Sequence, residues 1–181
     1  MMKIIGFCGL PGSGKSTAIE AIEDLGKVVT MGDVIREEAK KRGLEPSGDN
    51  LGKIARELRE EGGPEIIAQK CVDWIQSFDT DTVFIDGLRS MHEVKVFRQY
   101  WDFPIIAVLL DEELRFERLA KRNRSDDPQT LDALRSRDLR ELGFGLREVI
   151  QNADYKIQNN ISEKKFKREV REVVEKILSL K

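Results

Sequence analysis

The sequence has little of the chemistry on which many hydrolytic and metal centres depend. Its 181 residues include one histidine, His92, and two cysteines, Cys8 and Cys71, which stand far apart. A single histidine excludes serine–histidine nucleophilic catalysis and metal sites with two histidine ligands. The cysteines lack the C-x-x-C spacing of zinc and redox motifs, so we expect both to be small apolar residues of the core. Ser90 and Glu93 have capping-box spacing, which places His92 in the first turn of a helix.

Long apolar runs and an excess of one charge are absent as well. No stretch approaches the roughly 20 apolar residues of a membrane-spanning helix, so we expect no membrane partner. The opening Met1-Met2-Lys3 leads straight into an apolar run without the pattern of a secretory signal, which favours a cytoplasmic protein. The net charge of −2 arises from 31 basic and 33 acidic residues, which argues against nucleic acid as the main partner. The oligomeric state is left open.

What the sequence does have is the pattern of one folded α/β domain. Hydrophobic residues make up 40% and charged residues 35% of the chain, which is typical of a globular protein, and 181 residues fit a single domain. Short apolar runs alternate with helical stretches, which indicates a parallel sheet with helices on both faces. The expected strands are residues 4–8, 28–31, 83–85, 105–110 and 155–157. The expected helices are residues 15–25, 34–41, 50–61, 65–78, 93–100, 112–121, 131–141 and 163–180.

Two stretches interrupt this alternation. Residues 33–78 place three helices between the second and third strands, an insertion large enough to hold a substrate. Residues 122–145 carry a charged helix and end in glycines that can act as a hinge, so we expect a mobile lid. The alternating charges of that helix favour ion pairs within the segment; the residues are Asp132, Arg135, Arg137, Asp138, Arg140 and Glu141.

The most specific motif follows the first apolar run. Residues 9–16 match the phosphate-binding pattern G-x-x-x-x-G-K-[ST] between a strand and a helix. Backbone N–H groups of such a loop form an anion nest, and the next helix points its positive end at the same phosphates. Lys15 should reach the β- and γ-phosphates, and Ser16, beside Thr17, can place a hydroxyl on Mg²⁺. We therefore expect ATP and Mg²⁺ to bind here, with nucleotide contacts from Gly9, Leu10, Pro11, Gly12, Ser13, Gly14, Lys15, Ser16 and Thr17.

Phosphoryl transfer also needs a carboxylate near the metal and an acceptor site. Asp86 follows the apolar run 83–85, where its carboxylate can hold a Mg²⁺-bound water beside Ser16. Asp33 and Arg36 are three residues apart, so on a helix they share a face and can point together at an acceptor.

A group of arginines precedes the lid. Arg115, Arg118 and Arg122 follow one another at three- or four-residue spacing on a predicted helix, so one face can present them to a polyphosphate. We expect Arg118 and Arg122, with Lys15, to neutralise the migrating phosphoryl group.

These segments resemble the nucleoside monophosphate kinase group of P-loop proteins. Adenylate kinases carry G-D-x-x-R after the second strand, which is similar to Gly32 through Arg36 here, and a helix with L-G-K, which is similar to residues 51–53. After the third strand they carry D-G-F-P-R, whereas this chain has Asp86-Gly87-Leu88-Arg89, one residue shorter and without the proline. The resemblance implies that Arg36 and Arg89 clamp the phosphate of the acceptor.

The C-terminal third is more similar to dephospho-coenzyme A kinase. Chains of that family end with an A-D-x-x-I-x-N strand before a last helix, and residues 153–159 match this pattern. Residues 119–124 resemble the start of the lid in both families. The mixture of features indicates a separate branch of the group, such as the archaeal adenylate-kinase-related proteins, rather than either namesake enzyme.

The motif and the resemblance predict a P-loop NTPase fold with three α/β/α layers and a five-stranded parallel sheet. Residues 1–181 would form one kinase domain, with an acceptor-binding insertion at about 33–78 and a lid at about 122–145. The predicted function is ATP-dependent phosphoryl transfer to a small molecule, with a nucleoside monophosphate favoured because Asp33, Arg36 and Arg89 together leave net positive charge. Two alternatives stand beside it. One is a hydroxyl acceptor such as dephospho-coenzyme A, with Asp33 as the base; the other is a nucleotide-switched regulatory ATPase whose insertion docks a partner.

Overall fold

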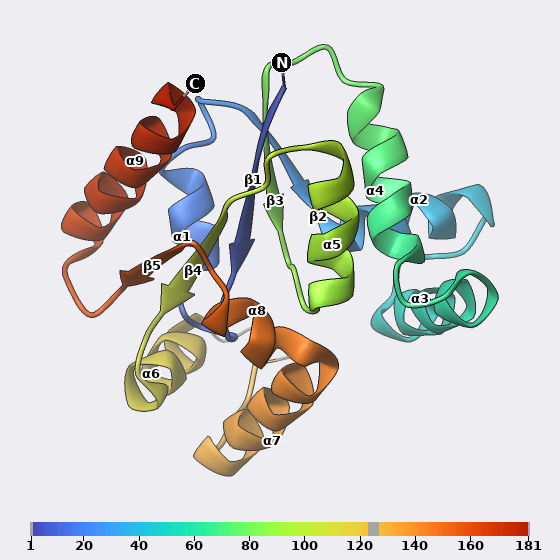
Figure 1. Cartoon of the computed structure of the whole chain (residues 1–181). Coiled ribbons are helices and arrows are strands. Elements are labelled where there is room, and N and C mark those ends of the chain that lie inside the picture. Colours follow the sequence, from blue (N-terminus) through green and yellow to red (C-terminus); the bar gives the residue numbers. More distant parts are fainter. Residues whose placement is uncertain (1, 123–126, 181) are drawn as a thin grey trace.

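A five-stranded parallel sheet forms the centre of the molecule (Figure 1). The computed structural model describes residues 2–122 and 127–180, so residues 123–126 of the predicted lid lie outside the described residues. The strand order is β2-β3-β1-β4-β5, and the predicted fold class is confirmed. The strands are β1 (Lys3–Cys8), β2 (Lys27–Thr30), β3 (Thr82–Asp86), β4 (Ile105–Leu109) and β5 (Tyr155–Gln158).

Each face of the sheet is covered by its own set of helices because successive strand residues point to opposite sides. Ile4 and Cys8 of β1 belong to an apolar cluster with helices α4, α5 and α8. Ile5 and Phe7 of the same strand belong to a second cluster with α1 and α9. Both faces are therefore apolar, as a fully covered parallel sheet requires. The helices are α1 (Lys15–Glu20), α2 (Met31–Lys41), α3 (Gly48–Gly62), α4 (Ile66–Gln76), α5 (Met91–Tyr100), α6 (Glu112–Arg122), α7 (Leu131–Glu141), α8 (Arg147–Gln151) and α9 (Glu163–Ser179), with a short π-helix, η1 (Leu142–Leu146).

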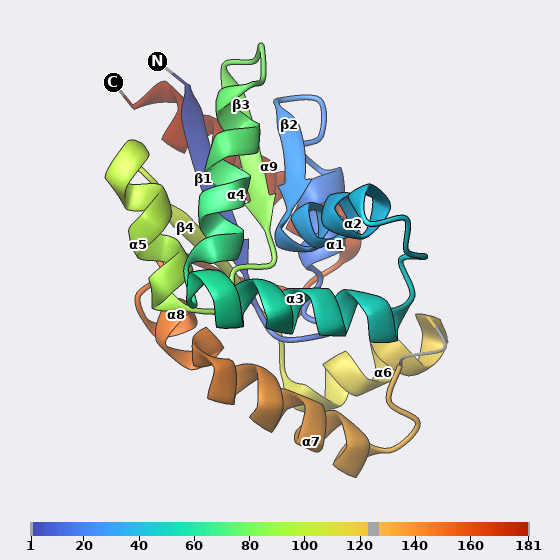
Figure 2. The ribbon, with the colours of Figure 1, turned by 90° about the vertical axis from the view of Figure 1, so that its right-hand side faces the viewer.

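The insertion between β2 and β3 consists of helices α2, α3 and α4, as expected, and Figure 2 shows α3 running across the end of the sheet near α7. Helix α2 begins at Met31, three residues earlier than predicted, because Thr30 and Asp33 form a capping box. The capping box predicted around His92 is confirmed, with Ser90 and Glu93 bonded reciprocally at the start of α5. Helix α1 is shorter than predicted and ends at Glu20 rather than at residue 25.

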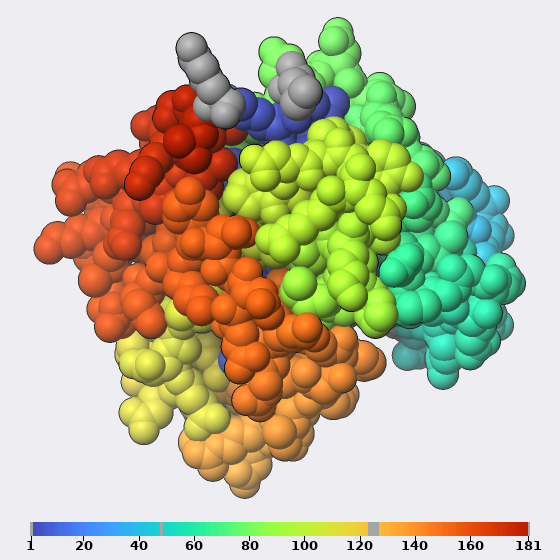
Figure 3. All heavy atoms as spheres, in the orientation of Figure 1, coloured from blue at the N-terminus to red at the C-terminus, as the bar shows by residue number. Residues whose placement is uncertain are grey.

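Helix α7 matches the helix predicted at residues 131–141, and it projects from the body of the molecule (Figure 3). It continues through η1 into α8, which the sequence pattern did not predict. Gly145 has a φ of 110°, and a Cβ atom there would lie 3.3 Å from the Arg89 carbonyl oxygen. The glycine is therefore needed for the close approach between the end of the lid segment and the loop after β3.

Both cysteines are buried, as predicted, and burial raises the pKa of Cys8 and of Cys71 to about 12. Neither thiol is ionised near neutral pH, so both pack as apolar side chains. Among residues 2–122 and 127–180, none of the helices combines the length and the apolar character needed to span a membrane.

Candidate functional site

The loop between β1 and α1 has the backbone shape of a phosphate-binding loop. Gly12 and Gly14 have φ values of 80° and 106°, a region that residues with a Cβ atom rarely adopt. A Cβ on Gly14 would also lie 2.0 Å from Asn159 Nδ2. Asn159 donates from this nitrogen to the Ser13 carbonyl oxygen at 2.8 Å and so ties the loop to the end of β5. The glycines are therefore required both by conformation and by close packing.

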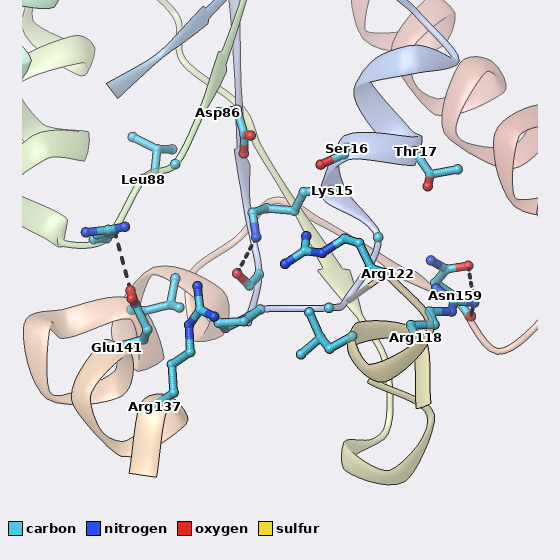
Figure 4. Close-up of a pocket in the computed structure, with 18 of the residues that line it drawn as sticks. Lys15, Ser16, Thr17, Asp86, Leu88, Arg118, Arg122, Arg137, Glu141 and Asn159 are labelled. Carbon is cyan, nitrogen blue, oxygen red and sulfur yellow. Dashed lines mark hydrogen bonds and ion pairs between the residues drawn. The ribbon is translucent and has the colours of Figure 1, made fainter. Parts of the chain in front are cut away.

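A cavity of about 510 Å³ opens directly on this loop (Figure 4). Its walls come from the loop itself, the segment after β3, helices α6 and α7, and the segment after β5. This places it at the carboxyl ends of the parallel strands, where open α/β sheets bind ligands. Its lining includes Gly9, Pro11, Gly12, Gly14, Lys15, Ser16, Thr17, Asp86, Gly87, Leu88, Arg89, Arg118, Leu119, Arg122, Arg137, Glu141, Leu146, Asn159 and Glu163.

Lys15 extends along the loop, and its Nζ donates a hydrogen bond of 2.8 Å to the Gly9 carbonyl oxygen. Burial lowers the pKa of Lys15, and the charge of Asp86 opposes this effect. The ammonium group is therefore held at the cavity with one backbone acceptor, which leaves its other donor positions for an anionic ligand.

Asp86, at the end of β3, is the group best suited to a metal. Among the described residues its buried Oδ1 atom has no hydrogen-bond partner. Burial raises the pKa of Asp86, although the charge of Lys15 acts against the increase. Figure 4 shows Asp86, Ser16 and Lys15 at one end of the cavity. An orphaned carboxylate oxygen beside a serine hydroxyl fits Mg²⁺, which takes few protein ligands and is otherwise held by waters and phosphates. No group of three or more His, Cys, Asp or Glu side chains suited to a metal occurs within the described residues.

Four arginines line the cavity besides Lys15, and the three that come from α6 and α7 differ in how they are held. Arg118 donates to the Asn159 carbonyl oxygen at 2.9 Å, whereas Arg122 pairs with Asp127, with its Nε 3.0 Å from Oδ2. Arg137 reaches the cavity from helix α7, and Figure 4 shows the side chains of Arg122 and Arg137 directed toward Lys15. Several fixed positive charges thus face one space, as binding of a polyphosphate requires.

The three residues predicted to bind the acceptor lie in two separate places. Arg89 lines the cavity and pairs with Glu141, with Nε 3.4 Å from Oε2. Asp33 and Arg36 are not among the cavity-lining residues. They lie at the start of α2, next to the β2–β3 edge where Thr30 stands opposite Asp86 in register.

Both carboxylate oxygens of Asp33 already accept hydrogen bonds. Oδ2 accepts from the Thr30 amide at 2.9 Å and Oδ1 from Arg36 Nη1 at 2.6 Å. Asp33 therefore caps α2 and orients Arg36. Since only Arg36 still has donors to offer, this arrangement suits positioning of an anion better than removal of a proton.

One expectation about charge was wrong, and a second was confirmed only in part. Arg115 does not join Arg118 and Arg122 on a phosphate-facing surface; it is buried and forms a bidentate pair with Asp138, at 3.0 and 2.6 Å. Asp132 and Arg135 pair within α7 as expected, but Asp138 pairs with Arg115 and Glu141 with Arg89, both outside the helix. Helical spacing correctly predicted that Arg118 and Arg122 face the cavity. It was wrong for Arg115, because helix α7 packs over the first turn of α6.

Of the predicted nucleotide-contact residues, Leu10 and Ser13 face away from the cavity and line a small pocket on the other side of the loop. Sequence reasoning assigned no site role to Arg137, Glu141 or Asn159. The pattern A-D-x-x-I-x-N pointed to Asn159, but a strand pattern alone does not reveal that the side chain turns onto the phosphate-binding loop. Arg137 and Glu141 were missed because the alternating charges of their helix indicated ion pairs within the segment.

The family described as "AAA domain" matches residues 8–135. A UPF0200 protein of Methanosarcina mazei is 41% identical over 181 residues, an alignment that covers 98% of this chain and 97% of the relative. A UPF0200/UPF0201 protein of Archaeoglobus fulgidus is 44% identical, and there the alignment covers 97% of this chain but only 56% of the relative. This chain therefore spans about half the length of that relative.

Solved structures with the same fold include two shikimate kinases. The enzyme from Bacteroides thetaiotaomicron has a TM-score of 0.65 at 15% identity, with 97% of this chain and 99% of that chain covered. The enzyme from Acinetobacter baumannii in complex with shikimate has a TM-score of 0.58 at 17% identity, with 99% and 94% covered. TT1252 from Thermus thermophilus has a TM-score of 0.63 at 18% identity, with 97% of each chain covered. At these identities the likeness establishes the fold alone.

Proposed function

Because the chain belongs to the UPF0200 family and folds as a P-loop kinase-like α/β domain, we propose that it is an ATP- and Mg²⁺-dependent phosphotransferase whose acceptor is a nucleoside monophosphate. The observation that carries the proposal is the composition of the 510 Å³ cavity. A phosphate-binding loop, an orphaned carboxylate and converging cations share one space. Phosphoryl transfer depends on positioning and charge compensation, and these are the groups that provide both.

The donor half of the cavity is formed by the phosphate-binding loop and α6. Loop N–H groups and Lys15 would bind the β- and γ-phosphates, while Arg122 and Arg137 would stabilise the charge on the migrating group. Ser16 and Asp86 would hold Mg²⁺, directly or through water, and the ion would neutralise phosphate charge. In the reaction the bond between the γ-phosphorus and the bridging oxygen of the β-phosphate breaks. A bond from that phosphorus to the acceptor oxygen forms, and ADP leaves.

The acceptor half is formed by the loop after β3 and the start of α2. Arg89 and Arg36 come from these two elements, which directly follow strands β3 and β2, and the two strands pair at Thr30 and Asp86. A monophosphate brings its own ionised oxygen nucleophile and needs cations rather than a base. A hydroxyl acceptor would need a base, and Asp33 has both oxygens engaged by Thr30 and Arg36. The arrangement therefore supports a phosphate acceptor.

The proposal is tested by incubating the protein with ATP, Mg²⁺ and single acceptors, followed by separation of the products. The acceptors are the nucleoside monophosphates, dephospho-coenzyme A and shikimate. We expect a diphosphate from at least one monophosphate. Phosphorylation of a hydroxyl acceptor alone would reject the monophosphate assignment. ATP hydrolysis with no acceptor phosphorylated, together with a partner protein that binds only the triphosphate form, would favour the regulatory ATPase.

Arg36→Ala should raise the KM for the monophosphate by about 10- to 100-fold and change the KM for ATP little, because one charge-assisted contact to phosphate is lost. Arg42→Ala is the matched control, since Arg42 follows the same helix but pairs with Glu38 and Glu57. Steady-state kinetics with each substrate varied in turn make the comparison. Equal effects of the two substitutions would place the acceptor elsewhere.

The lid prediction can be tested independently of turnover. Residues 127–145 of the predicted lid should exchange amide hydrogens more slowly once a non-hydrolysable ATP analogue and Mg²⁺ are added, since Arg137 of this segment lines the cavity and water must be excluded from the phosphoryl group. Exchange measured by mass spectrometry with and without the analogue gives the answer. Identical exchange in both states would identify a static charged surface.

A further inference from the structure

A buried ion pair joins helices α6 and α7 beneath the phosphate-binding loop. Arg115 is 3% exposed and Asp138 is 7% exposed. The guanidinium donates to Asp138 through Nη1 and Nη2 at 3.0 and 2.6 Å. Two charges are seldom placed in the interior unless their geometry is bidentate and their remaining donors are satisfied, and this pair meets both conditions.

Two further N–H groups of Arg115 donate to backbone carbonyl groups outside α7. Nη1 also donates to the Pro11 carbonyl oxygen at 3.1 Å, and Nε donates to the Leu110 carbonyl oxygen at 3.2 Å. Pro11 belongs to the phosphate-binding loop, and Leu110 follows β4. One guanidinium therefore connects the loop, the end of a central strand and helix α7.

The same packing brings α6 against the loop. A Cβ atom on Gly12 would lie 3.0 Å from the Arg115 carbonyl oxygen and 2.9 Å from Leu119 Cγ. The Pro11–Gly12 region consequently rests on α6 with no room to spare. A shift of Arg115 would be transmitted to it through both the side chain and the backbone.

Asp138 also fixes which face of α7 meets the cavity. Arg137 and Glu141 are four residues apart and share a helix face, and both line the cavity. Asp138, next to Arg137, points instead toward α6. The bond to Asp138 therefore sets the rotation of α7 about its axis, and this rotation determines that Arg137 and Glu141 point into the cavity.

We infer that Arg115 is a positioning residue, which couples the shape of the phosphate-binding loop at Pro11 to the placement of Arg137 and Glu141 on helix α7. The inference rests on the proposed function only in taking a triphosphate as the ligand. Because coupling between two elements is reciprocal, ordering of the loop by a triphosphate must also order α7. Arg115 is then the connection by which binding at the loop reaches the lid helix.

The test variant is Arg115→Met/Asp138→Leu, called the latch variant, which replaces the Arg115–Asp138 ion pair by two apolar side chains that fill the same space. Replacement of a buried ion pair by such residues is often neutral or stabilising, so the fold should survive. The matched control is Glu112→Gln/Arg135→Gln. Those two side chains pair at 2.9 Å between the same two helices, at an exposed position. Asp138→Asn is the milder variant, since it retains one acceptor for Arg115, and it decides the matter if the double variant does not fold.

Two measurements are made on each protein. The first is hydrogen exchange without nucleotide in residues 9–16 and 131–141. The second is the calorimetric affinity for a non-hydrolysable ATP analogue with Mg²⁺. In the latch variant we expect about tenfold faster exchange in both segments and about tenfold weaker binding, within the usual range of coupling between sites. Adding the analogue should slow exchange in 131–141 of the wild type but not of the latch variant, and the control should behave as wild type.

Wild-type exchange in residues 9–16 together with wild-type affinity in a folded latch variant would overturn the inference. Effects of equal size in the control would also overturn it, because any link between α6 and α7 would then suffice. If the wild-type protein itself did not bind the analogue, the proposed function would fail. The exchange measured without nucleotide would still decide the role of Arg115.

Discussion

Lys15→Ala should lower the rate of phosphoryl transfer by about a thousandfold while the fold remains intact, because a preorganised charge at the transferring group is worth several kcal/mol. Lys15 makes its hydrogen bond to the Gly9 carbonyl oxygen at the cavity and is not part of the apolar clusters. Burial lowers its pKa, so the protein gives up little stability when the ammonium group is removed. The loss should therefore fall on the chemistry.

The measurement is initial rates of product formation together with thermal unfolding followed by circular dichroism. Lys95→Ala serves as the control, since Lys95 is an exposed lysine of α5, a helix that covers the face of the sheet opposite α1. We expect wild-type rates from the control and cooperative unfolding near the wild-type temperature from both variants. A wild-type rate of turnover in the Lys15→Ala variant would contradict the assignment as a kinase.

Asp86→Asn should produce opposite changes in activity and stability. The substitution should lower turnover by about 100-fold, the upper range for loss of a residue that holds a metal through its hydration shell. It should also raise the free energy of unfolding of the nucleotide-free protein, because a neutral side chain replaces a carboxylate whose charged form is disfavoured by burial. Among the described residues the Oδ1 atom of this carboxylate has no hydrogen-bond partner that would offset the cost of burying its charge.

The pH dependence gives the sign of the stability change. Burial raises the pKa of Asp86 in the folded protein, so the folded state binds a proton more tightly than the unfolded state. The contribution of Asp86 to stability therefore falls as the pH rises from about 4, near the ordinary pKa of aspartate, through the raised value. The advantage of the asparagine variant should be present at pH 7 and vanish in acid. Denaturant unfolding at both pH values measures it, and lower stability of the variant at neutral pH would contradict this account.

The strands and the phosphate-binding loop were predictable because they depend on local patterns. Apolar runs separated by helical periods predict a parallel sheet, and the motif at residues 9–16 requires its strand and helix on either side. The carboxyl end of β3 could be predicted equally well, since Asp86 ends an apolar run. These are features that one segment of the chain determines by itself.

The misread residues are those whose roles depend on a second segment. Arg115 has the helical spacing of a phosphate-facing residue, yet the packing of α7 over α6 gives it Asp138 as a buried partner. Arg137 and Glu141 read as members of a solvated charged helix until α7 is placed beside the cavity. Tertiary packing, which no single segment specifies, decided each of these roles.

A crystal structure with Mg²⁺, a non-hydrolysable ATP analogue and the best monophosphate tests the central claim most directly. We predict that the β- and γ-phosphates lie on the loop with Lys15. The phosphate group of the monophosphate should bind Arg89 in place of Glu141, with Arg36 turned toward it. The γ-phosphate should lie between Arg122 and Arg137, facing the acceptor phosphate. A triphosphate bound in this way beside an acceptor half that holds no monophosphate, with the pair between Arg89 and Glu141 intact, would contradict it.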